Sequence, residues 1–380
     1  MTILYHHRTR ARDGQSVHID ELIRALQAEG HRVVVVEPRR VEATAQTIER
    51  QLLPRFVYEL AEFAYSFLEF AKLAAAALRH RPDVLYERAN LYMLSGLWTA
   101  KLFRLPYLLE VNAPLAQERG KFGGLSWPQF AAWTERSCWR GASVALPVTA
   151  ALAEFLRSAG VAPERIAVTP NGVDLSEFRP HDMAEAKARL GLQGALVLGF
   201  VGYVREWHGL DRIVELLARR PPLADARLLV VGDGPARPAL EQQAASLGIS
   251  DRIRFTGTAP RTALPELISA MDIALQPEVT AYASPLKLFE YMALGRTIVA
   301  PATPNILEVL EDGSDALLFP QGDSAALAAA IERLAADQAL RERLGAAAAA
   351  KIVARDMTWR GNARRVAAAG KPRGVAVAPA

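Results

Sequence analysis

The stretch DIALQPEVTAYASPLKLFEYMALG, residues 272–295, reads as a strand, a loop and a helix in that order. Asp272–Gln276 is a short apolar run, which predicts a buried strand. We expect a helix over Pro285–Leu294, because Ser284 is a favourable N-cap, proline suits the first helical position and Gly295 can end the helix. A helix that starts just beyond the carboxyl end of a strand is typical of a parallel α/β sheet.

The same alternation of short apolar runs and helical stretches extends along the whole chain. In the first half we expect strands over Ile3–His7, Arg32–Glu37, Asp83–Glu87, Tyr107–Asn112, Ser143–Val148 and Ile166–Thr169. In the second half we expect them over Ala195–Val201, Arg227–Val231, Ile253–Thr256, Asp272–Gln276, Thr297–Ala300 and Ala316–Phe319. Between them lie predicted helices such as Ser16–Glu29 and Ala150–Ala159. Right-handed crossovers then imply two doubly wound domains of the α/β class.

A chain of 380 residues and 41.4 kDa, 51% of it hydrophobic, is long and apolar enough for two packed domains. The segment Asn171–Leu192 contains proline and glycine but no strand pattern, so it is the expected linker. We expect an N-terminal domain over 1–175 and a C-terminal domain over 176–355, facing each other across a cleft. Residues 356–380 should form a helix that crosses back, followed by a disordered tail.

Charge and cysteine content exclude several classes of protein. A net charge of only +4, with no basic domain, argues against a nucleic-acid binder. The single cysteine, Cys138, excludes a disulfide framework and a thiolate zinc site, and it fits a reducing, cytoplasmic compartment. The apolar start of the chain is too short for a signal peptide, and Phe63–Leu78, interrupted by Glu69 and Lys72, is too short to span a bilayer.

The predicted helix over Pro285–Leu294 has the features of a phosphate site. Free N–H groups and the helix dipole attract an anion at its start, and Lys287 in the first turn adds a positive charge. Glu290, one turn deeper, could accept hydrogen bonds from sugar or ribose hydroxyls. The alternative is an ordinary Lys–Glu pair on the helix surface, and Ser284 could serve as cap or ligand.

Two further strand-to-helix loops of the second half could contact the same ligand. In the loop Gly202–Gly209, Arg205 could bind a diphosphate and His208 could donate to one, although the neighbouring Trp207 also fits a packing role. Gly234 belongs to a Gly-Asp-Gly-Pro turn after another strand. That turn is only a weak dinucleotide-like motif, because tight turns need glycine for backbone reasons.

The first half offers weaker candidates. The loop after the first strand contains His6, His7, Arg8, Arg10, Arg12, Asp13 and Gly14, a polar and basic connection suited to an anion or acceptor. His18, in the following helix, could act as an acid, a base or a hydrogen-bonding group, or could simply line the core. The predicted strand Tyr107–Asn112 places Glu110 or Asn112 at its carboxyl end.

No D-x-D, H-E-x-x-H, G-x-S-x-G or P-loop motif occurs in the sequence. This absence disfavours metalloenzymes, serine hydrolases and P-loop proteins.

These motifs, in their order, identify a family resemblance. Thr169-Pro170-Asn171-Gly172-Val173-Asp174 with Phe178 and Pro180, then VVGDGP at 230–235, FTG at 255–257 and LFEYMALG at 288–295, resemble the retaining glycosyltransferases of family 4, also called glycosyl transferases group 1. Members have the GT-B architecture of two facing Rossmann-like domains. The resemblance covers nearly the whole chain and is most specific in the second half.

The resemblance implies transfer of a sugar from a nucleotide-sugar donor, UDP- or GDP-linked, to a hydroxyl of a glycan or lipid-linked acceptor, with retention of configuration and without a bound metal or other cofactor. It places the donor mainly in the second domain, at Arg205, His208, Gly234, Ser284, Lys287 and Glu290, with Gly14 of the first domain as a further contact and Glu290 on the ribose. It makes His18, Asn112 and His208 the catalytic candidates. Such a hexosyltransferase would serve cell-envelope glycan or glycolipid assembly, in the cytoplasm or peripherally on the inner face of the membrane.

Some positions depart from the family pattern. The usual Arg and Lys after the first strand of the second domain fall at Tyr203 and His208, the usual first glutamate of Glu-x7-Glu falls at Tyr282, and the usual first-domain histidine falls at Asn112. These substitutions motivate a rival interpretation, a catalytically inactive sugar-nucleotide-binding protein or partner subunit. A GT-B epimerase or phosphorylase is a third interpretation.

The aromatic stretch Arg55–Phe70 fits either an interfacial membrane contact or a helix packed on the first sheet, and we favour the second.

Overall fold

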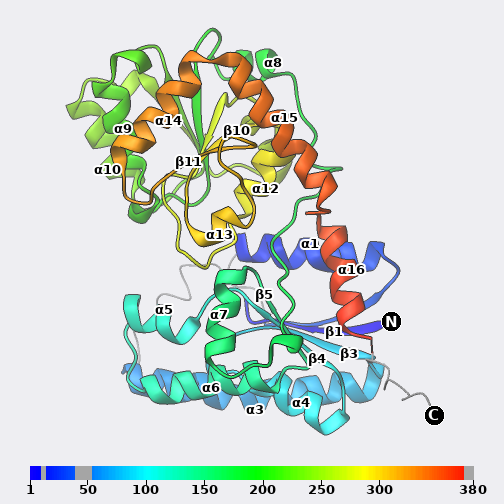
Figure 1. The fold of residues 1–380 in the computed structure, drawn as a ribbon. Coiled ribbons are helices and arrows are strands. Elements are labelled where there is room, and N and C mark those ends of the chain that lie inside the picture. The colour runs from blue at the N-terminus through cyan, green and yellow to red at the C-terminus, as the bar shows by residue number, and fades with distance from the viewer. Residues whose placement is uncertain (10–13, 39–53, 372–380) are drawn as a thin grey trace. The chain divides into compact units, whose positions relative to one another are not determined.

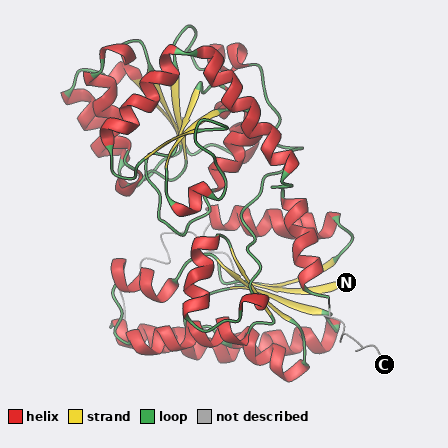
Figure 2. Cartoon of the chain, in the orientation of Figure 1, coloured by secondary structure: helices red, strands yellow, loops and turns green. Residues whose placement is uncertain are grey.

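The computed structural model describes residues 1–9, 14–38 and 54–371, which form two compact units (Figure 1). Unit 1 contains Met1–Asn171, the short segment Tyr282–Ser284 and the chain from Trp359 onward, and unit 2 contains Gly172–Ala281 and Pro285–Thr358. In both units the strands lie in the middle and helices cover both faces of the sheet (Figure 2). Both therefore have the doubly wound α/β architecture expected from the alternating sequence pattern.

Unit 1 is built on a five-stranded parallel sheet in the order β2-β1-β3-β4-β5. Its strands are β1 (Thr2–His6), β2 (Arg32–Val36), β3 (Val84–Arg88), β4 (Tyr107–Val111) and β5 (Val144–Pro147). Its helices are α1 (Gly14–Ala28), α3 (Arg55–His80), α4 (Ser95–Phe103), α5 (Leu115–Phe122), α6 (Pro128–Gly141), α7 (Ala150–Ser158) and α16 (Trp359–Ala369). α3, α4 and α6 lie under one face of the sheet, and α1 and α16 pack together on the other.

Unit 2 is built on a six-stranded parallel sheet in the order β11-β10-β9-β6-β7-β8. Its strands are β6 (Val197–Val201), β7 (Arg227–Val231), β8 (Ile253–Gly257), β9 (Ile273–Leu275), β10 (Thr297–Pro301) and β11 (Leu317–Phe319). Its helices are α8 (Met183–Arg189), α9 (Leu210–Arg219), α10 (Arg237–Ser246), α11 (Leu264–Ser269), α12 (Leu286–Ala293), α13 (Pro304–Leu307), α14 (Ser324–Ala336) and α15 (Gln338–Ala354).

One predicted strand is wrong. Ile166–Thr169 makes only one bridge, between Ile166 and Ala145, and two N–H groups of this segment donate to carbonyls of β5. A parallel ladder continues only if the partner strand returns a hydrogen bond, and Pro147 has no N–H to return. The predicted linker Asn171–Leu192 also contains helix α8, capped by the side chain of Asp182.

The unit boundaries fall at Asn171/Gly172 and Thr358/Trp359, a few residues from the boundaries expected at 175/176 and 355/356. The last helix, α16, belongs to unit 1, as the sequence suggests. The tail beyond Lys371 and three charged residues of the predicted anion-binding loop, Arg10, Arg12 and Asp13, lie outside the described residues.

A buried ionic cluster joins β1, β3 and α3 beneath the sheet of unit 1. His6 Nδ1 lies 2.6 Å from Glu87 Oε1, and His6 Nε2 lies 3.3 Å from Glu69 Oε2. All three side chains are at most 2% exposed. Burial alone would lower the pKa of His6, but the two carboxylates outweigh it and raise that pKa to about 9. His6 is therefore a buried imidazolium at neutral pH.

This cluster predicts a loss of stability at alkaline pH. Because the folded pKa of His6 is above its unfolded value of 6.5, its stabilisation is complete below pH 6.5 and is lost as the pH rises through about 9. We expect the unfolding free energy of the wild type to fall by roughly 2–3 kcal/mol over this range relative to His6→Gln. Urea unfolding at pH 6, 7.5 and 9.5 measures it, and parallel pH profiles of the two proteins would contradict the assignment.

Candidate functional site

Helix α12 of unit 2 carries both predicted phosphate-site residues and is fixed to the end of strand β6. The hydroxyl of Tyr291, a buried residue, accepts a hydrogen bond of 2.9 Å from the N–H of Val201, the last residue of β6. The helix begins at Leu286, with Pro285 as its N-cap and no side-chain cap. The expectation that Ser284 caps it is wrong, because the Ser284 hydroxyl accepts the N–H of Asn171 at 3.1 Å instead.

Lys287 lies at the carboxyl end of β6 in an apolar setting. Its Nζ is 3.7 Å from the centre of the Phe200 ring, and a Cβ placed on Gly202 would lie only 3.3 Å from that nitrogen. Burial lowers the pKa of Lys287 to about 7, although Glu290 partly offsets this effect. An ammonium that is poorly solvated and close to bare backbone is suited to bind an anion, which would restore its full charge.

His208 adds a neutral hydrogen-bond donor beside this lysine. Its Nδ1 accepts the N–H of Arg205 at 3.1 Å, and its ring lies 5.0 Å from the Phe200 ring. Burial, together with the positive charges of Lys287 and Arg205, lowers the pKa of His208 to about 3. Because Nδ1 accepts, the single proton of the neutral ring sits on Nε2. The exposed Arg205 guanidinium lies over the Tyr203 ring at 5.0 Å.

The glycines of the VVGDGP motif allow two loops to pack backbone against backbone. A Cβ on Gly232 would come within 2.0 Å of the Gly202 carbonyl oxygen, and one on Gly234 within 2.2 Å of the Val204 oxygen. The Val204 N–H donates to the Asp233 carbonyl at 2.9 Å. Loop packing therefore already requires glycine at 234, and a donor contact of Gly234 stays a prediction.

Glu290 is 5% exposed and has a cationic partner that the sequence patterns did not single out. Arg261 Nη1 lies 3.2 Å from Glu290 Oε1, and the same guanidinium binds Glu177 and lies 4.9 Å over the Phe178 ring. Arg261 follows strand β8, so it too lies beyond the carboxyl end of a strand. A search of every strand-to-helix loop for arginine would have found it; only its pairing with Glu290 needs the fold.

The predicted residues of the first domain meet around one buried carboxylate. Glu110 Oε2 lies 3.1 Å from His18 Nε2, and Glu110 Oε1 accepts from Asn112 Nδ2 at 2.6 Å. His18 Nδ1 lies 2.6 Å from Asn171 Oδ1, and the Asn171 amide nitrogen donates to the Ser284 carbonyl, so His18 is the donor in its pair. The His18 ring also meets Trp359 edge to face at 4.9 Å.

The structure thus separates the predicted residues into two sets. Those of unit 2 are Arg205, His208, Gly234, Lys287 and Glu290, and those of unit 1 are Gly14, His18, Asn112 and Ser284. His18 is 5% exposed and has both ring nitrogens next to partners, so it supports the structure of unit 1 whatever else it does. Gly14 is the first residue of α1 and directly follows residues 10–13, which lie outside the described part of the chain.

Tyr282 stands where the family commonly has a glutamate, and the chain at this point packs in unit 1. The Tyr282 carbonyl accepts from the Thr149 hydroxyl at 3.0 Å, and its ring meets Phe155 edge to face at 6.4 Å. Burial and the nearby Glu118 raise the pKa of Tyr282 to about 12. This side chain is a neutral packing residue.

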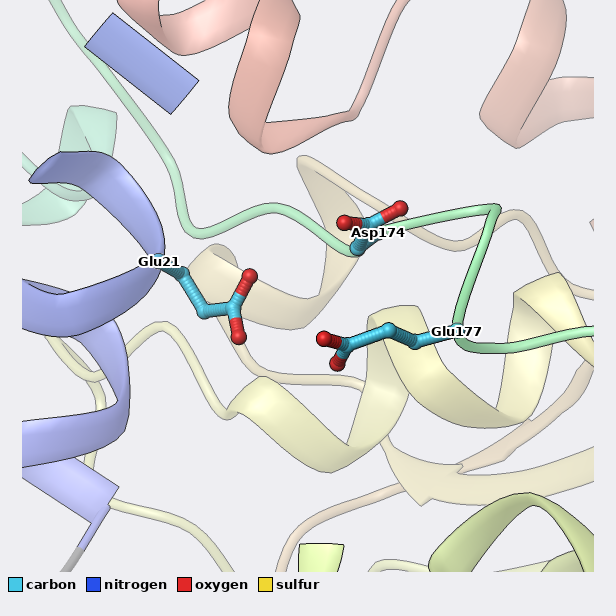
Figure 3. A group of neighbouring side chains, drawn as sticks. All are labelled: Glu21, Asp174 and Glu177. Atoms are coloured by element: carbon cyan, nitrogen blue, oxygen red, sulfur yellow. The ribbon is translucent and has the colours of Figure 1, made fainter. Parts of the chain in front are cut away.

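Figure 3 shows two acidic side chains on the segment that opens unit 2, Asp174 and Glu177. Asp174 accepts the N–H and the hydroxyl of Ser176 at 2.7 Å, and Glu177 pairs with Arg261. The third carboxylate in the picture, Glu21, belongs to α1 of unit 1. Within unit 2, Asp174 and Glu177 both accept hydrogen bonds from other residues of the protein. Two carboxylates are fewer ligands than a magnesium or calcium site uses. Function without a metal stays a prediction.

Two family matches cover consecutive halves of the chain. Residues 12–177 match the family described as "Glycosyltransferase Family 4", and residues 182–351 match "Glycosyl transferases group 1". The chain belongs to glycosyltransferase family 4. The expectation from its motifs is confirmed, and the two parallel-sheet Rossmann-like domains are those of the GT-B fold of this family.

Curated relatives and solved structures agree with this assignment. The chain is 30% identical to a 2-deoxystreptamine glucosyltransferase of Streptomyces kanamyceticus over 65% of this chain and 66% of the relative. It is 36% identical to a D-inositol 3-phosphate glycosyltransferase of Frankia alni over 54% and 52%. These matches span only part of the relatives' length. In fold, the chain resembles Anabaena HepE, solved in complex with UDP, with a TM-score of 0.78 at 21% identity over 97% of this chain and 99% of HepE.

Proposed function

We propose that this family 4 member transfers a hexose, with retention of configuration, from a UDP- or GDP-sugar to an acceptor hydroxyl. Unit 2 would bind the donor and unit 1 the acceptor. The observation that carries the proposal is that Lys287 and the neutral His208 both lie beside Phe200 at the carboxyl end of β6. One supplies a positive charge and the other an Nε2–H donor, both beside the Phe200 ring, a combination that suits a diphosphate.

The chain's own groups would stabilise the leaving diphosphate. The bond from the anomeric carbon to the phosphate oxygen breaks, the bond to the acceptor oxygen forms on the same face of the sugar, and the acceptor proton passes to the departing phosphate. Lys287 and Arg205 would balance the charge that develops on that phosphate, and His208 would donate a hydrogen bond to it. Glu290, held by Arg261, would accept hydrogen bonds from the ribose hydroxyls. His18 and Asn112 remain our candidates for contact with the acceptor or the reacting sugar, and Gly14 and Ser284 for backbone contacts with the donor.

Known proteins support the donor class and leave the acceptor open. HepE has been solved with UDP and with UDP-glucose, and the two curated relatives act, by name, on 2-deoxystreptamine and on D-inositol 3-phosphate. Polyhydroxylated acceptors therefore fit the proposal, and we include a glycan or a glycolipid of the cell envelope among them. We also propose a cytoplasmic location, since Cys138 is a free, buried thiol. Among the described residues, no helix is long and apolar enough to cross a bilayer.

Calorimetry with UDP-, GDP- and ADP-sugars, without added metal, tests the donor site. We expect one nucleotide to bind selectively and Glu290→Gln to weaken it about tenfold, because the ribose hydroxyls lose a charged acceptor. The matched control is Glu266→Gln, which removes a carboxylate paired with Arg189 elsewhere in unit 2 and should bind the donor normally. Equal effects of the two substitutions would refute the role of Glu290.

Product analysis separates the three interpretations of the fold. Nucleotide release that depends on an added acceptor supports a transferase, and the anomeric configuration of the product reports retention. Tight nucleotide binding without turnover supports the inactive binding protein or partner subunit. An isomerised sugar nucleotide without acceptor supports the epimerase.

A further inference from the structure

Helix α3 of unit 1 has an apolar stripe on the side that faces away from its sheet. Its inner side is buried, as at Leu73 and Ala77. Its outer side carries exposed apolar residues at spacings of four or three, namely Phe56, Leu60, Ala64, Phe67, Ala71, Ala75 and Leu78. The expectation that this helix packs on the first sheet accounts for only one of its two sides. A stripe of this length on a helix surface normally meets a partner.

Aromatic contacts extend this stripe across the two neighbouring helices. Phe67 of α3 meets Trp98 of α4 with ring centres 5.0 Å apart. Phe63 of α3 meets Phe130 of α6 at 5.0 Å, and Phe130 stacks on Trp133 at 5.8 Å. Phe67 is 57% exposed and Trp133 is 54% exposed, so the array reaches solvent at both ends. α3, α4 and α6 lie under the same face of the sheet in Figure 1.

The charges on these three helices have one sign at the surface. Their exposed charged residues are all basic, namely Arg55, Lys72, Arg79, Lys101, Arg136 and Arg140. Their acidic residues are turned inward or paired: Glu59, Glu69 and Glu135 are buried, and Glu62 binds Arg119. On α6 a hollow of about 450 Å³ is lined by Trp133, Arg136 and Arg140, among others, and combines the aromatic and basic features in one place.

We propose that α3, α4 and α6 form a docking face for the surface of an anionic lipid bilayer. Phenylalanine and tryptophan side chains enter the boundary between headgroups and acyl chains, and arginine and lysine remain at the level of the lipid phosphates. A second copy of the chain fits this face less well. A twofold interface would place each basic patch against its own copy, with no exposed acidic residue on these helices to pair with it.

This inference deepens the proposed function, on which it rests for its purpose: docking through unit 1 would bring the acceptor-binding domain to lipid-linked acceptors. Lipid binding itself is measured without donor, acceptor or turnover. A failure of sugar transfer and a failure of membrane docking can therefore be told apart.

Co-sedimentation with vesicles of phosphatidylcholine alone, or of phosphatidylcholine with phosphatidylglycerol, tests the docking face. We expect the full chain to bind the anionic vesicles and to be released by salt. Phe67→Glu, and the double change Arg136→Glu with Arg140→Glu, should each weaken binding at least about tenfold. Val353→Glu is the matched control, because Val353 is an apolar residue, 67% exposed, on α15 of unit 2.

Three results would overturn the proposal. The first is absence of wild-type binding to anionic vesicles at low salt, and the second is an equal loss in Val353→Glu. The third is a wild-type dimer in analytical ultracentrifugation that Phe67→Glu converts to monomer, since the face would then join two copies. Thermal unfolding of the variants confirms that unit 1, which carries Phe67, Arg136 and Arg140, is folded in each of them.

Discussion

Replacing Lys287 with methionine is expected to weaken nucleotide-sugar binding roughly 100-fold. A charge-assisted hydrogen bond in a poorly solvated site contributes about 1.5–3 kcal/mol, and Lys287 Nζ has the Phe200 ring on one side and the Gly202 backbone on another. Methionine keeps the length and apolar character of the side chain, so α12 should remain in place. Isothermal calorimetry gives the affinity, and an unchanged dissociation constant would remove Lys287 from the donor site.

The same lysine predicts how binding depends on pH. The pKa of Lys287 is lowered to about 7, and a diphosphate favours the charged form, so the affinity should fall as the pH rises above 7, by up to about tenfold per unit. A nucleotide sugar is the right probe, because its diphosphate does not titrate in this range. Lys287→Arg keeps its charge throughout and should give a flat profile. A wild-type profile as flat as that of Lys287→Arg would show that this pKa is not near neutral.

Glu110→Gln should lower the stability of unit 1 by roughly 3 kcal/mol, or about 10 °C in melting temperature. Glu110 is buried, and burial would raise its pKa, but His18 and Arg88 more than compensate and hold that pKa well below its usual range. Arg88, Tyr86 and Asn112 all donate to this carboxylate. Removing its charge leaves the buried Arg88 guanidinium without a counter-ion.

Glu135 is the matched control in the same unit. It is also buried, but burial raises its pKa to about 7 even though the Ala116 N–H donates to it. A carboxylate with a raised pKa costs stability once the pH exceeds its unfolded value, so Glu135→Gln should be neutral or stabilising at pH 8. Differential scanning calorimetry compares the two variants. Equal destabilisation by Glu110→Gln and Glu135→Gln would mean that the Arg88–Glu110 ion pair does not stabilise unit 1.

Most of the fold could be predicted from local patterns in this one sequence. The strands can be recognised as short apolar runs, and the helix ends as glycines. Gly30 and Gly160 follow the ends of two predicted helices, and both have positive φ. The prediction failed at Ile166–Thr169, where the apolar run was right but the partner strand ended in proline. The cause is Pro147, about twenty positions earlier in the chain, and a local pattern does not include so distant a residue.

The candidate site was predictable only in part, for a similar reason. Lys287 and His208 could be predicted as site residues because both lie in connections that follow a strand. Arg261, the partner of Glu290, is 29 residues away in sequence, and the His18 pair with Asn171 joins residues 153 apart. The pKa values of Lys287 and His208 also depend on Phe200 and on burial, which exist only after folding. The positions of Lys287 and His208 could therefore be predicted, whereas their protonation states depend on the folded surroundings.

The division of unit 1 into three chain segments constrains the order of its assembly. Trp359 packs on His18, Asn362 donates to the Pro170 carbonyl, and Arg360 binds Glu29, so the final helix completes the domain that the first residues begin. During synthesis on a ribosome, unit 2 has its whole sheet before this last helix emerges. The domain that starts first must therefore finish last, and a nascent or truncated chain ending before residue 359 presents an uncovered α1 to chaperones and proteases.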